Sequence, residues 1–274
     1  MAVVVQESSS SLFNAGDEVV LTGNKIGQHC DGGYSELCRV QAEWLVPKPP
    51  AFTLEECMII GTAGFTAMQM VMELETCGGL SVANASEPVL VLGAAGGAGS
   101  MAVSLLASQG YKVVASSRRA ESLRTYLEDL GAHDVIGALE SNSRPLQNQK
   151  WSAVLDCAGS PALGTALSQL RYQGAAACIG VAGAATLEAS LYPFVLRGVR
   201  LLGIDATLPW NVPGYSDDPA VWQRHRQFRL DVWKRIEQAA SLEALDKMHE
   251  ATIALGDLPQ WTEKILAGEV RGQG

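Results

Sequence analysis

A glycine-rich turn separates a strand-like segment from a helix-like one at residues 93–99, where the sequence reads Gly-Ala-Ala-Gly-Gly-Ala-Gly. The apolar run PVLVL at 88–92 precedes this turn, and a helical pattern at 97–109 follows it. Glycines at such a turn let the backbone approach a phosphate group, which the first N–H groups of the helix then bind. The spacing G-x-x-G-x-x-G differs from the common G-x-G-x-x-G, so tight packing of the helix on the strand, without a ligand, remains a second interpretation.

The next strand-like segment, KVVAS at 112–116, is followed by Ser117, Arg118 and Arg119. A site for NAD places an Asp or Glu about 20 residues after the glycines, where it accepts hydrogen bonds from the adenosine ribose. An acid would repel a 2′-phosphate, whereas a hydroxyl and guanidinium groups hydrogen-bond it and offset its charge. The sequence therefore predicts NADPH as the cofactor. A solvated helix start that happens to carry two arginines is the alternative.

Length and composition favour a folded protein that acts on small molecules. The 274 residues allow one large domain or two of ordinary size, and we expect two. Hydrophobic residues make up 47% and charged residues 18%, as is typical of globular proteins. The net charge of -9 argues against a nucleic-acid partner, because that affinity depends on Lys and Arg neutralising phosphates.

The sequence also predicts a cytoplasmic location, with no membrane span and no metal site. Apolar runs such as 191–206 are interrupted by Arg, Gly or Asp, and the first residues lack the features of a signal peptide. The six cysteines form no C-x-x-C pair and lie mostly in apolar segments, which is typical of free thiols in a reducing compartment. His29-Cys30-Asp31 has no second group of ligands at a useful spacing.

Alternating strand and helix patterns from residue 88 onward predict the fold class. Nearly continuous Val, Ala and Leu strands that alternate with helices are typical of a parallel sheet covered on both faces. We therefore expect an α/β protein with a doubly wound parallel sheet. Before it, residues 17–22 and 34–46 are expected to form short strands of a β-rich unit.

The connecting segments carry turn and helix signals. PKPPAF at 47–52 predicts a linker or a sharp turn, and Thr53 followed by two glutamates predicts a capped helix start. Residues 210–219 are expected to form a loop, and most of 217–270 to be helical.

Segments over nearly the whole chain carry a resemblance to a known family. They are AGDEVVLTG (15–23), GGYSELCRV (32–40), WLVPKP (44–49), MIIGTAGFTAM (58–68), GAAGGAGSMAV (93–103), GYKVVASSRR (110–119), LDCAG (155–159), YQGAAACIGVAG (172–183) and YPFVLRGVRLLGID (192–205). They resemble the zinc-free medium-chain dehydrogenase/reductase superfamily, in its quinone-oxidoreductase-like branch, and within that branch the acryloyl-CoA reductases that use NADPH. The fourth and last segments are fairly specific to that subfamily.

Two other dehydrogenase classes lack support. Short-chain dehydrogenases need a Tyr-x-x-x-Lys pair, and none of the six tyrosines has a lysine four residues later. Zinc alcohol dehydrogenases need a Gly-His-Glu motif and a lobe of closely spaced cysteines, and the sequence contains neither.

The resemblance implies three groups of cofactor-binding residues. The diphosphate group consists of Ala95, Gly96, Gly97 and Ala98. The 2′-phosphate group consists of Ser117, Arg118 and Arg119, of which Arg119 is the better candidate because relatives usually carry a smaller residue at position 118. The third group consists of Cys157, Gly180 and Ile204, near the adenosine ribose or nicotinamide, and of Thr62, near the nicotinamide. Ordinary core packing of Cys157 and Ile204, and helix capping by Thr62, are the alternatives.

The resemblance also implies a domain organisation. Residues 1–57 would be the remnant of a β-rich, GroES-like catalytic domain, 58–207 an NADP-binding Rossmann domain, and 208–274 a helical segment that packs back toward the catalytic domain. Relatives begin with further strands and an Asn-Tyr-Lys-Asp motif, so the chain is expected to be an N-terminally truncated member. No catalytic residue is assigned.

The implied reaction is reduction by NADPH of the C=C bond of a small α,β-unsaturated acyl-CoA, carried out by a homodimer. Two alternatives remain at this point. One is a quinone or enone reductase of the same superfamily, and the other is a truncated homologue that binds NADPH without catalysis.

Overall fold

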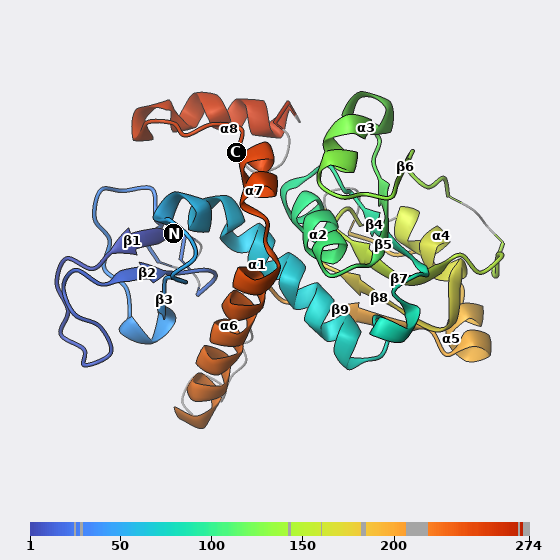
Figure 1. The fold of residues 1–274 in the computed structure, drawn as a ribbon, viewed down its shortest axis with the longest axis horizontal. Coiled ribbons are helices and arrows are strands. Elements are labelled where there is room, and N and C mark those ends of the chain that lie inside the picture. The colour runs from blue at the N-terminus through green and yellow to red at the C-terminus, as the bar shows by residue number, and fades with distance from the viewer. Residues whose placement is uncertain are drawn as a thin grey trace.

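The structure, a computed structural model, describes residues 1–24, 26–27, 30–141, 144–159, 161–181, 185–206, 219–267 and 269–270. Two sheets lie toward opposite ends of the molecule, and the long helix α1 (Leu54–Thr76) runs between them (Figure 1).

The larger sheet is parallel throughout and has the strand order β6-β5-β4-β7-β8-β9. Its strands are β4 (Pro88–Leu92), β5 (Lys112–Ser116), β6 (Asp134–Ile136), β7 (Trp151–Asp156), β8 (Leu170–Cys178) and β9 (Arg200–Gly203). Because β5 and β6 lie on one side of β4 and the later strands on the other, the sheet is doubly wound. The predicted fold class is confirmed.

Alternate residues of the central strands enter two separate apolar cores. Val89 and Val91 of β4 face a core shared with α1, α2 (Gly97–Ser108) and α3 (Ala120–Asp129). Leu90 and Leu92 face the second core, which includes α4 (Ala162–Ser168) and side chains of α5 (Tyr192–Arg197). Each fully buried Val or Leu stabilises the fold by about 1.5–3 kcal/mol. Burial on both faces explains why these strands are nearly continuous apolar runs.

Helix α1 begins at a capping box, as the sequence predicts. The Thr53 hydroxyl accepts the N–H of Glu56 at 3.1 Å, and the Glu56 carboxylate accepts the N–H of Thr53 at 2.6 Å. Gly61 then interrupts the helix with φ 49° and ψ −154°, so α1 consists of two helical pieces joined at a kink.

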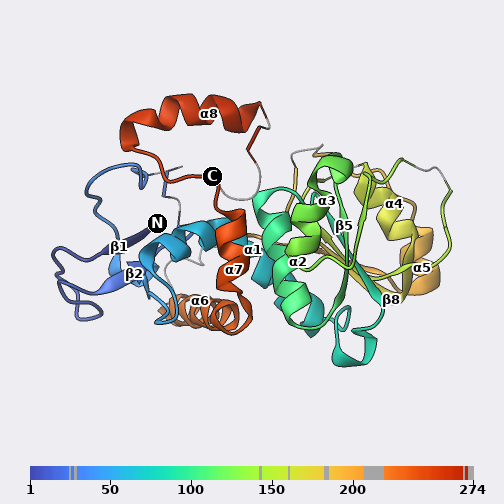
Figure 2. The same cartoon turned by 45° about the horizontal axis from the view of Figure 1, so that its top comes forward.

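By length and mean hydropathy alone, α1 could cross a membrane. However, 67% of its apolar window is buried inside the protein, where α1 packs against α2, α6 (Pro219–Ala239) and α7 (Leu242–Met248) (Figure 2). We therefore assign α1 as a core helix of this fold.

The smaller sheet contains β1 (Ala2–Val4), β2 (Glu18–Val20) and β3 (Val46–Pro47), all antiparallel. The prediction of a strand at 17–22 is confirmed in part, whereas the prediction for 34–46 is wrong. That segment contains the short 3-10 helix Ala42–Trp44 and reaches a strand only at Val46. Its residues 34–39 are exposed, so their apolar–polar alternation is not matched by a buried face.

The C-terminal part is helical, as predicted, with α6, α7 and α8 (Leu258–Leu266) connected in part by a 3-10 helix, Leu255–Asp257. The Arg235 guanidinium on α6 donates to both carboxylate oxygens of Glu75 at 3.0 Å and to Gln109 Oε1 at 2.7 Å. This cluster links α6 to α1 and to the end of α2. Residues 210–218 of the predicted loop lie outside the described residues.

The domain boundaries remain predictions. The one after residue 57 falls within α1, and the one after residue 207 lies outside the described residues. The short 3-10 helix Val82–Asn84 precedes β4, where the parallel sheet begins.

Candidate cofactor site

The carboxyl ends of β4 and β7 form the switch point of the sheet. These two strands pair with each other, but the chain leaves β4 toward β5 and leaves β7 toward β8, in opposite directions. Loops that diverge from adjacent parallel strands create a crevice at the sheet edge, where ligands of doubly wound proteins bind. The glycine turn that sequence analysis singled out leaves β4 at this point.

The glycine turn is shaped by two positions where a side chain would not fit. Gly93 has φ 70°, a left-handed conformation that favours glycine. At Gly99 an added Cβ would lie 2.2 Å from the Gly93 carbonyl oxygen and 2.7 Å from Ala94 Cα. The first turn of α2 therefore packs directly on the backbone of the preceding turn.

The N-terminus of α2 presents backbone donors at the surface. Gly96 is the N-cap residue, has no side-chain cap and is exposed, while Gly97 and Ala98 are half-buried. The first N–H groups of a helix have no carbonyl partner within the helix, and the helix dipole adds positive potential there. This end of α2 is thus suited to bind an anion. The side chain of Ala95 is buried beneath it, 4% exposed.

The end of β5 lies beside this turn. The N–H of Ala94 donates to the carbonyl oxygen of Ser116 at 3.1 Å, which connects the glycine turn to the Ser-Ser-Arg-Arg segment. Ser117 is 7% exposed, and its hydroxyl accepts the N–H of Arg119 at 3.1 Å. The hydroxyl proton of Ser117 is therefore available for donation to another acceptor.

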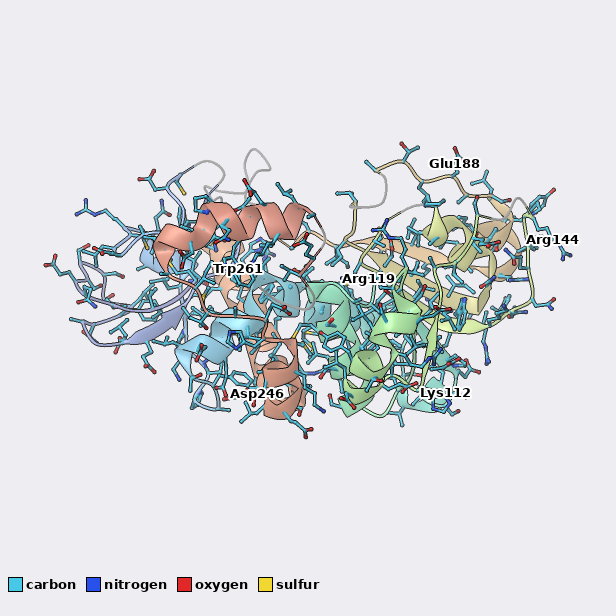
Figure 3. The ribbon with its side chains drawn as sticks, turned by 90° about the horizontal axis from the view of Figure 1, so that it is seen from above. Lys112, Arg119, Arg144, Glu188, Asp246 and Trp261 are labelled. Atoms are coloured by element: carbon cyan, nitrogen blue, oxygen red, sulfur yellow. The ribbon has the colours of Figure 1, made fainter. Side chains whose placement is uncertain are left out.

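Arg118 and Arg119 are both exposed at the start of α3, where Arg119 is the N-cap residue. The N-terminus of a helix carries partial positive charge, so cationic side chains there are repelled, whereas near the C-terminus they are stabilising. The two arginines add positive charge at this end of α3, and this charge can attract an anionic ligand. In Figure 3, Arg119 lies near the middle of the molecule, whereas Arg144 and Glu188 lie toward one end of it.

The loops after β7 and β8 meet the glycine turn. An added Cβ at Gly180 would lie 2.3 Å from the Cys157 carbonyl carbon, and one at Gly93 would lie 3.2 Å from the same atom. The N–H of Cys157 donates to the Leu92 carbonyl oxygen at 3.0 Å, and the N–H of Ile204 donates to that of Cys178 at 3.0 Å. Cys157, Gly180 and Ile204 thus follow three neighbouring strands at one edge of the sheet.

Asp156, which sequence analysis did not single out, holds the turn after β7. Its side chain is fully buried, and its carboxylate accepts the N–H groups of Ala158 at 3.1 Å and Gly159 at 3.0 Å. Burial raises the pKa of Asp156 even though these two hydrogen bonds oppose the shift. Burial, and then the Asp156 charge, raise the pKa of the Cys157 thiol. The sequence did contain a signal for this role, because the carboxylate of Asp156 directly follows the apolar run AVL.

Thr62 is exposed and begins the second helical piece of α1, directly after the kink at Gly61. Its carbonyl oxygen accepts the Thr66 hydroxyl at 2.6 Å. Two residues later, an added Cβ at Gly64 would lie 2.7 Å from Met101 Cε on α2. This close packing sets the start of the second piece beside the first turns of α2, and hence near the glycine turn.

Within the described ranges, no group of three or more His, Cys, Asp or Glu side chains could hold a metal ion. His29, from the cluster noted in the sequence, lies outside those ranges. Cys38 is an exposed free thiol, whereas the Cys57 thiol is buried.

Comparisons with known proteins agree with this geometry. The family model described as "Zinc-binding dehydrogenase" matches residues 97–215. The acrylyl-CoA reductase AcuI of Ruegeria pomeroyi is 40% identical over 99% of this chain and 77% of its own length. The putative quinone oxidoreductase YhfP of Bacillus subtilis is 37% identical over 99% of this chain and 78% of its own, and its structure, with NAD bound, has a TM-score of 0.87.

A further solved structure carries a phosphorylated dinucleotide. The yhdH oxidoreductase of Salmonella enterica, in complex with NADP, is 38% identical with a TM-score of 0.87. The match covers 99% of this chain and 78% of that protein. The similarity thus includes the parallel sheet, the small sheet and the helices between them.

Proposed function

This chain belongs to the medium-chain dehydrogenase/reductase superfamily, in the group that contains the acrylyl-CoA reductases, and from this we propose that it reduces the C=C bond of a small α,β-unsaturated acyl-CoA with NADPH. The observation that carries the proposal is the 40% identity to acrylyl-CoA reductase AcuI, which extends over 99% of the chain. The Ser-Ser-Arg-Arg segment beside the glycine turn supports the choice of NADPH.

The residues at the sheet edge fit NADPH. The small residues Gly96, Gly97 and Ala98 leave the first N–H groups of α2 open to a diphosphate, since an added Cβ at Gly96 would meet no atom closer than 3.6 Å. We assign Ser117 and Arg119, with Arg118, to the 2′-phosphate, because a hydroxyl donor and two cations complement its charge.

The remaining predicted residues would enclose the other end of the cofactor. We assign Cys157, Gly180 and Ile204 to the ribose and nicotinamide, mostly through backbone groups, and Thr62 to the nicotinamide. The raised pKa keeps the Cys157 thiol neutral at physiological pH. Cys157 would therefore contact the cofactor as a small apolar group and not as a nucleophile.

When bound, NADPH supplies the hydride that adds to the β-carbon of the unsaturated thioester. The α-carbon then takes a proton, and hydrogen-bond donors near the thioester oxygen would stabilise the charge that collects there. The contribution of this chain is to hold the reactive carbons within about 3–3.5 Å of each other and to limit access of water. We assign no side chain as proton donor.

A quinone is the second candidate substrate, because YhfP, a putative quinone oxidoreductase, is 37% identical over almost the same span. Loss of NADPH absorbance, measured with acryloyl-CoA and separately with 1,4-benzoquinone, distinguishes the candidates. We expect turnover with acryloyl-CoA. Turnover with the quinone alone would favour the second candidate, and binding of NADPH without turnover of either would indicate a non-catalytic homologue.

We also propose a homodimer and a cytoplasmic location. β9 is an edge strand of the larger sheet, and on α5 just before it Val195 is 76% and Leu196 56% exposed. An apolar surface beside an unpaired edge supports association of two copies. The exposed free thiol of Cys38 supports a reducing compartment. Light scattering of the purified protein would test the dimer, for which a monomer mass at micromolar concentration is the contrary result.

A further inference from the structure

A buried chain of hydrogen bonds joins α3 to the glycine turn through α2. Tyr126 of α3 is 8% exposed, and its hydroxyl lies 2.9 Å from Oγ of Ser100, which is fully buried on α2. The Ser100 hydroxyl lies 3.1 Å from the carbonyl oxygen of Ala94 in the glycine turn. These two hydrogen bonds therefore connect α3, α2 and the glycine turn inside the apolar core.

Each of the two hydroxyl groups has one proton, and this fixes which group donates in each hydrogen bond. The Ala94 carbonyl oxygen only accepts, so the single hydroxyl proton of Ser100 points to it. Ser100 Oγ must then accept the hydroxyl proton of Tyr126. Buried donors and acceptors that satisfy one another in series form a rigid connection, because breaking one bond leaves a buried polar group without a partner.

The two ends of the chain belong to the two phosphate-binding elements. Ala94 lies in the turn proposed to bind the diphosphate, and its N–H is held at 3.1 Å by the Ser116 carbonyl oxygen. Tyr126 lies on the helix whose first turn follows Arg118 and Arg119, proposed to bind the 2′-phosphate. The Arg119 backbone is about two helical turns from Tyr126. A shift of α3 relative to α2 would therefore move the arginines relative to the glycine turn.

We propose that Tyr126 and Ser100 are positioning residues that set the spacing between the diphosphate site and the 2′-phosphate site, and so determine the preference for NADPH over NADH. This inference rests on the proposed binding of NADPH at this site. Without the Tyr126 hydroxyl, the glycine turn keeps its contact with β5, because the Ala94 N–H still donates to Ser116. The diphosphate site is retained, while α3 keeps its apolar packing but loses this hydrogen-bonded link to α2. NADH lacks the 2′-phosphate that Arg118 and Arg119 are proposed to bind, so it should be affected less.

Dissociation constants of NADPH and NADH, measured by nucleotide fluorescence on the full chain, test the inference in Tyr126→Phe and Ser100→Ala. We expect each variant to bind NADPH about 10-fold more weakly, as loss of one buried hydrogen bond implies, and NADH within about 2-fold of the unmodified protein. If the two hydrogen bonds act as one unit, the NADPH affinity of the double variant should equal that of the weaker-binding single variant. Independent hydrogen bonds would instead give a loss of affinity equal to the product of the two single losses.

The matched control is Tyr111→Phe. Tyr111 is half-buried at the opposite end of α2, beside Glu75 and Arg235, so its hydroxyl is remote from the glycine turn. This variant should leave the NADPH to NADH affinity ratio unchanged. Thermal melting of every variant separates a loss of folding from a loss of positioning, and Ser100→Ala still tests the inference if Tyr126→Phe does not fold.

The outcomes separate this inference from the proposed function. If the unmodified protein binds NADPH tightly but both variants weaken NADPH and NADH in parallel, or weaken neither, the positioning role is overturned and the proposed function stands. If the unmodified protein does not bind NADPH, the proposed function fails and the inference fails with it.

Discussion

The substitution Gly99→Ala tests whether α2 rests directly on the glycine turn. Within a helix, replacing glycine by alanine ordinarily stabilises a protein by about 0.5–1 kcal/mol, because alanine loses less backbone entropy. Here the added Cβ would lie 2.2 Å from the Gly93 carbonyl oxygen, although ordinary contact begins at 3.4 Å. The helix and the turn would have to separate by about 1.2 Å at a point where both are backbone.

Displacement of packed backbone costs about 3 kcal/mol, which outweighs the gain from helix propensity. The net loss of about 2–2.5 kcal/mol corresponds, for a chain of this size, to a fall in melting temperature of about 4–10 °C. Because the turn moves with the helix, we also expect NADPH to bind at least about 10-fold more weakly. Circular dichroism melts and nucleotide titration would measure the two effects.

The control for this experiment is Gly256→Ala. Gly256 lies in the 3-10 helix before α8, where an added Cβ would meet no atom within 4 Å. Its melting temperature should stay within about 1 °C of the unmodified protein, as is usual for a surface change. A Gly99→Ala protein that is as stable as the control and binds NADPH normally would refute the packing that the structure shows.

Two further predictions concern charge. Arg119→Ala should weaken NADPH binding about 10- to 100-fold through loss of a charge-assisted hydrogen bond and leave NADH unchanged, whereas Arg144→Ala, at an exposed position toward one end of the molecule, should change neither; equal effects of both would contradict the assignment. Burial raises the pKa of the Cys57 thiol from 9.0 to about 11, so it ionises at lower pH when the chain is unfolded. The contribution of this thiol to stability should therefore be constant below pH 9 and be lost as the pH rises from 9 toward 11, so the unmodified protein should lose more stability over this range than Cys57→Ala, as urea unfolding would show; parallel pH profiles would be the contrary result.

The parallel sheet could be predicted because both of its faces are buried. Runs such as PVLVL at 88–92 are apolar at every position, and this pattern, repeated between helical segments, fits few arrangements other than a doubly wound sheet. The helix start at Thr53 could also be predicted, because the two residues that cap it by hydrogen bonds to each other are only three positions apart in the sequence.

Features that depend on pairing between distant segments, or on the backbone rotation of a single residue, could not be predicted. The alternation at 34–46 resembled a strand, but a strand needs a partner, and the sequence does not show whether one pairs with it. The kink at Gly61 depends on one backbone rotation inside an apolar run that otherwise reads as a continuous helix.

The same limit applied to the candidate site. The glycine turn and the residues after β5 were identified because their chemistry is local in sequence. The hydrogen bond from Tyr126 to Ser100 spans 26 positions and exists only because α2 and α3 pack together. Asp156 was overlooked because its role is to hold two backbone N–H groups of the next turn, and residue type alone does not reveal that.

The central claim is that the end of β5 selects a phosphorylated dinucleotide beside the glycine turn. Titration of the purified, unmodified chain with NADPH and with NADH, at fixed ionic strength, tests it most directly. Two charge-assisted hydrogen bonds to the 2′-phosphate predict NADPH binding that is tighter by about 100-fold or more. Equal affinity for the two nucleotides, tighter binding of NADH, or no binding of either would contradict the claim.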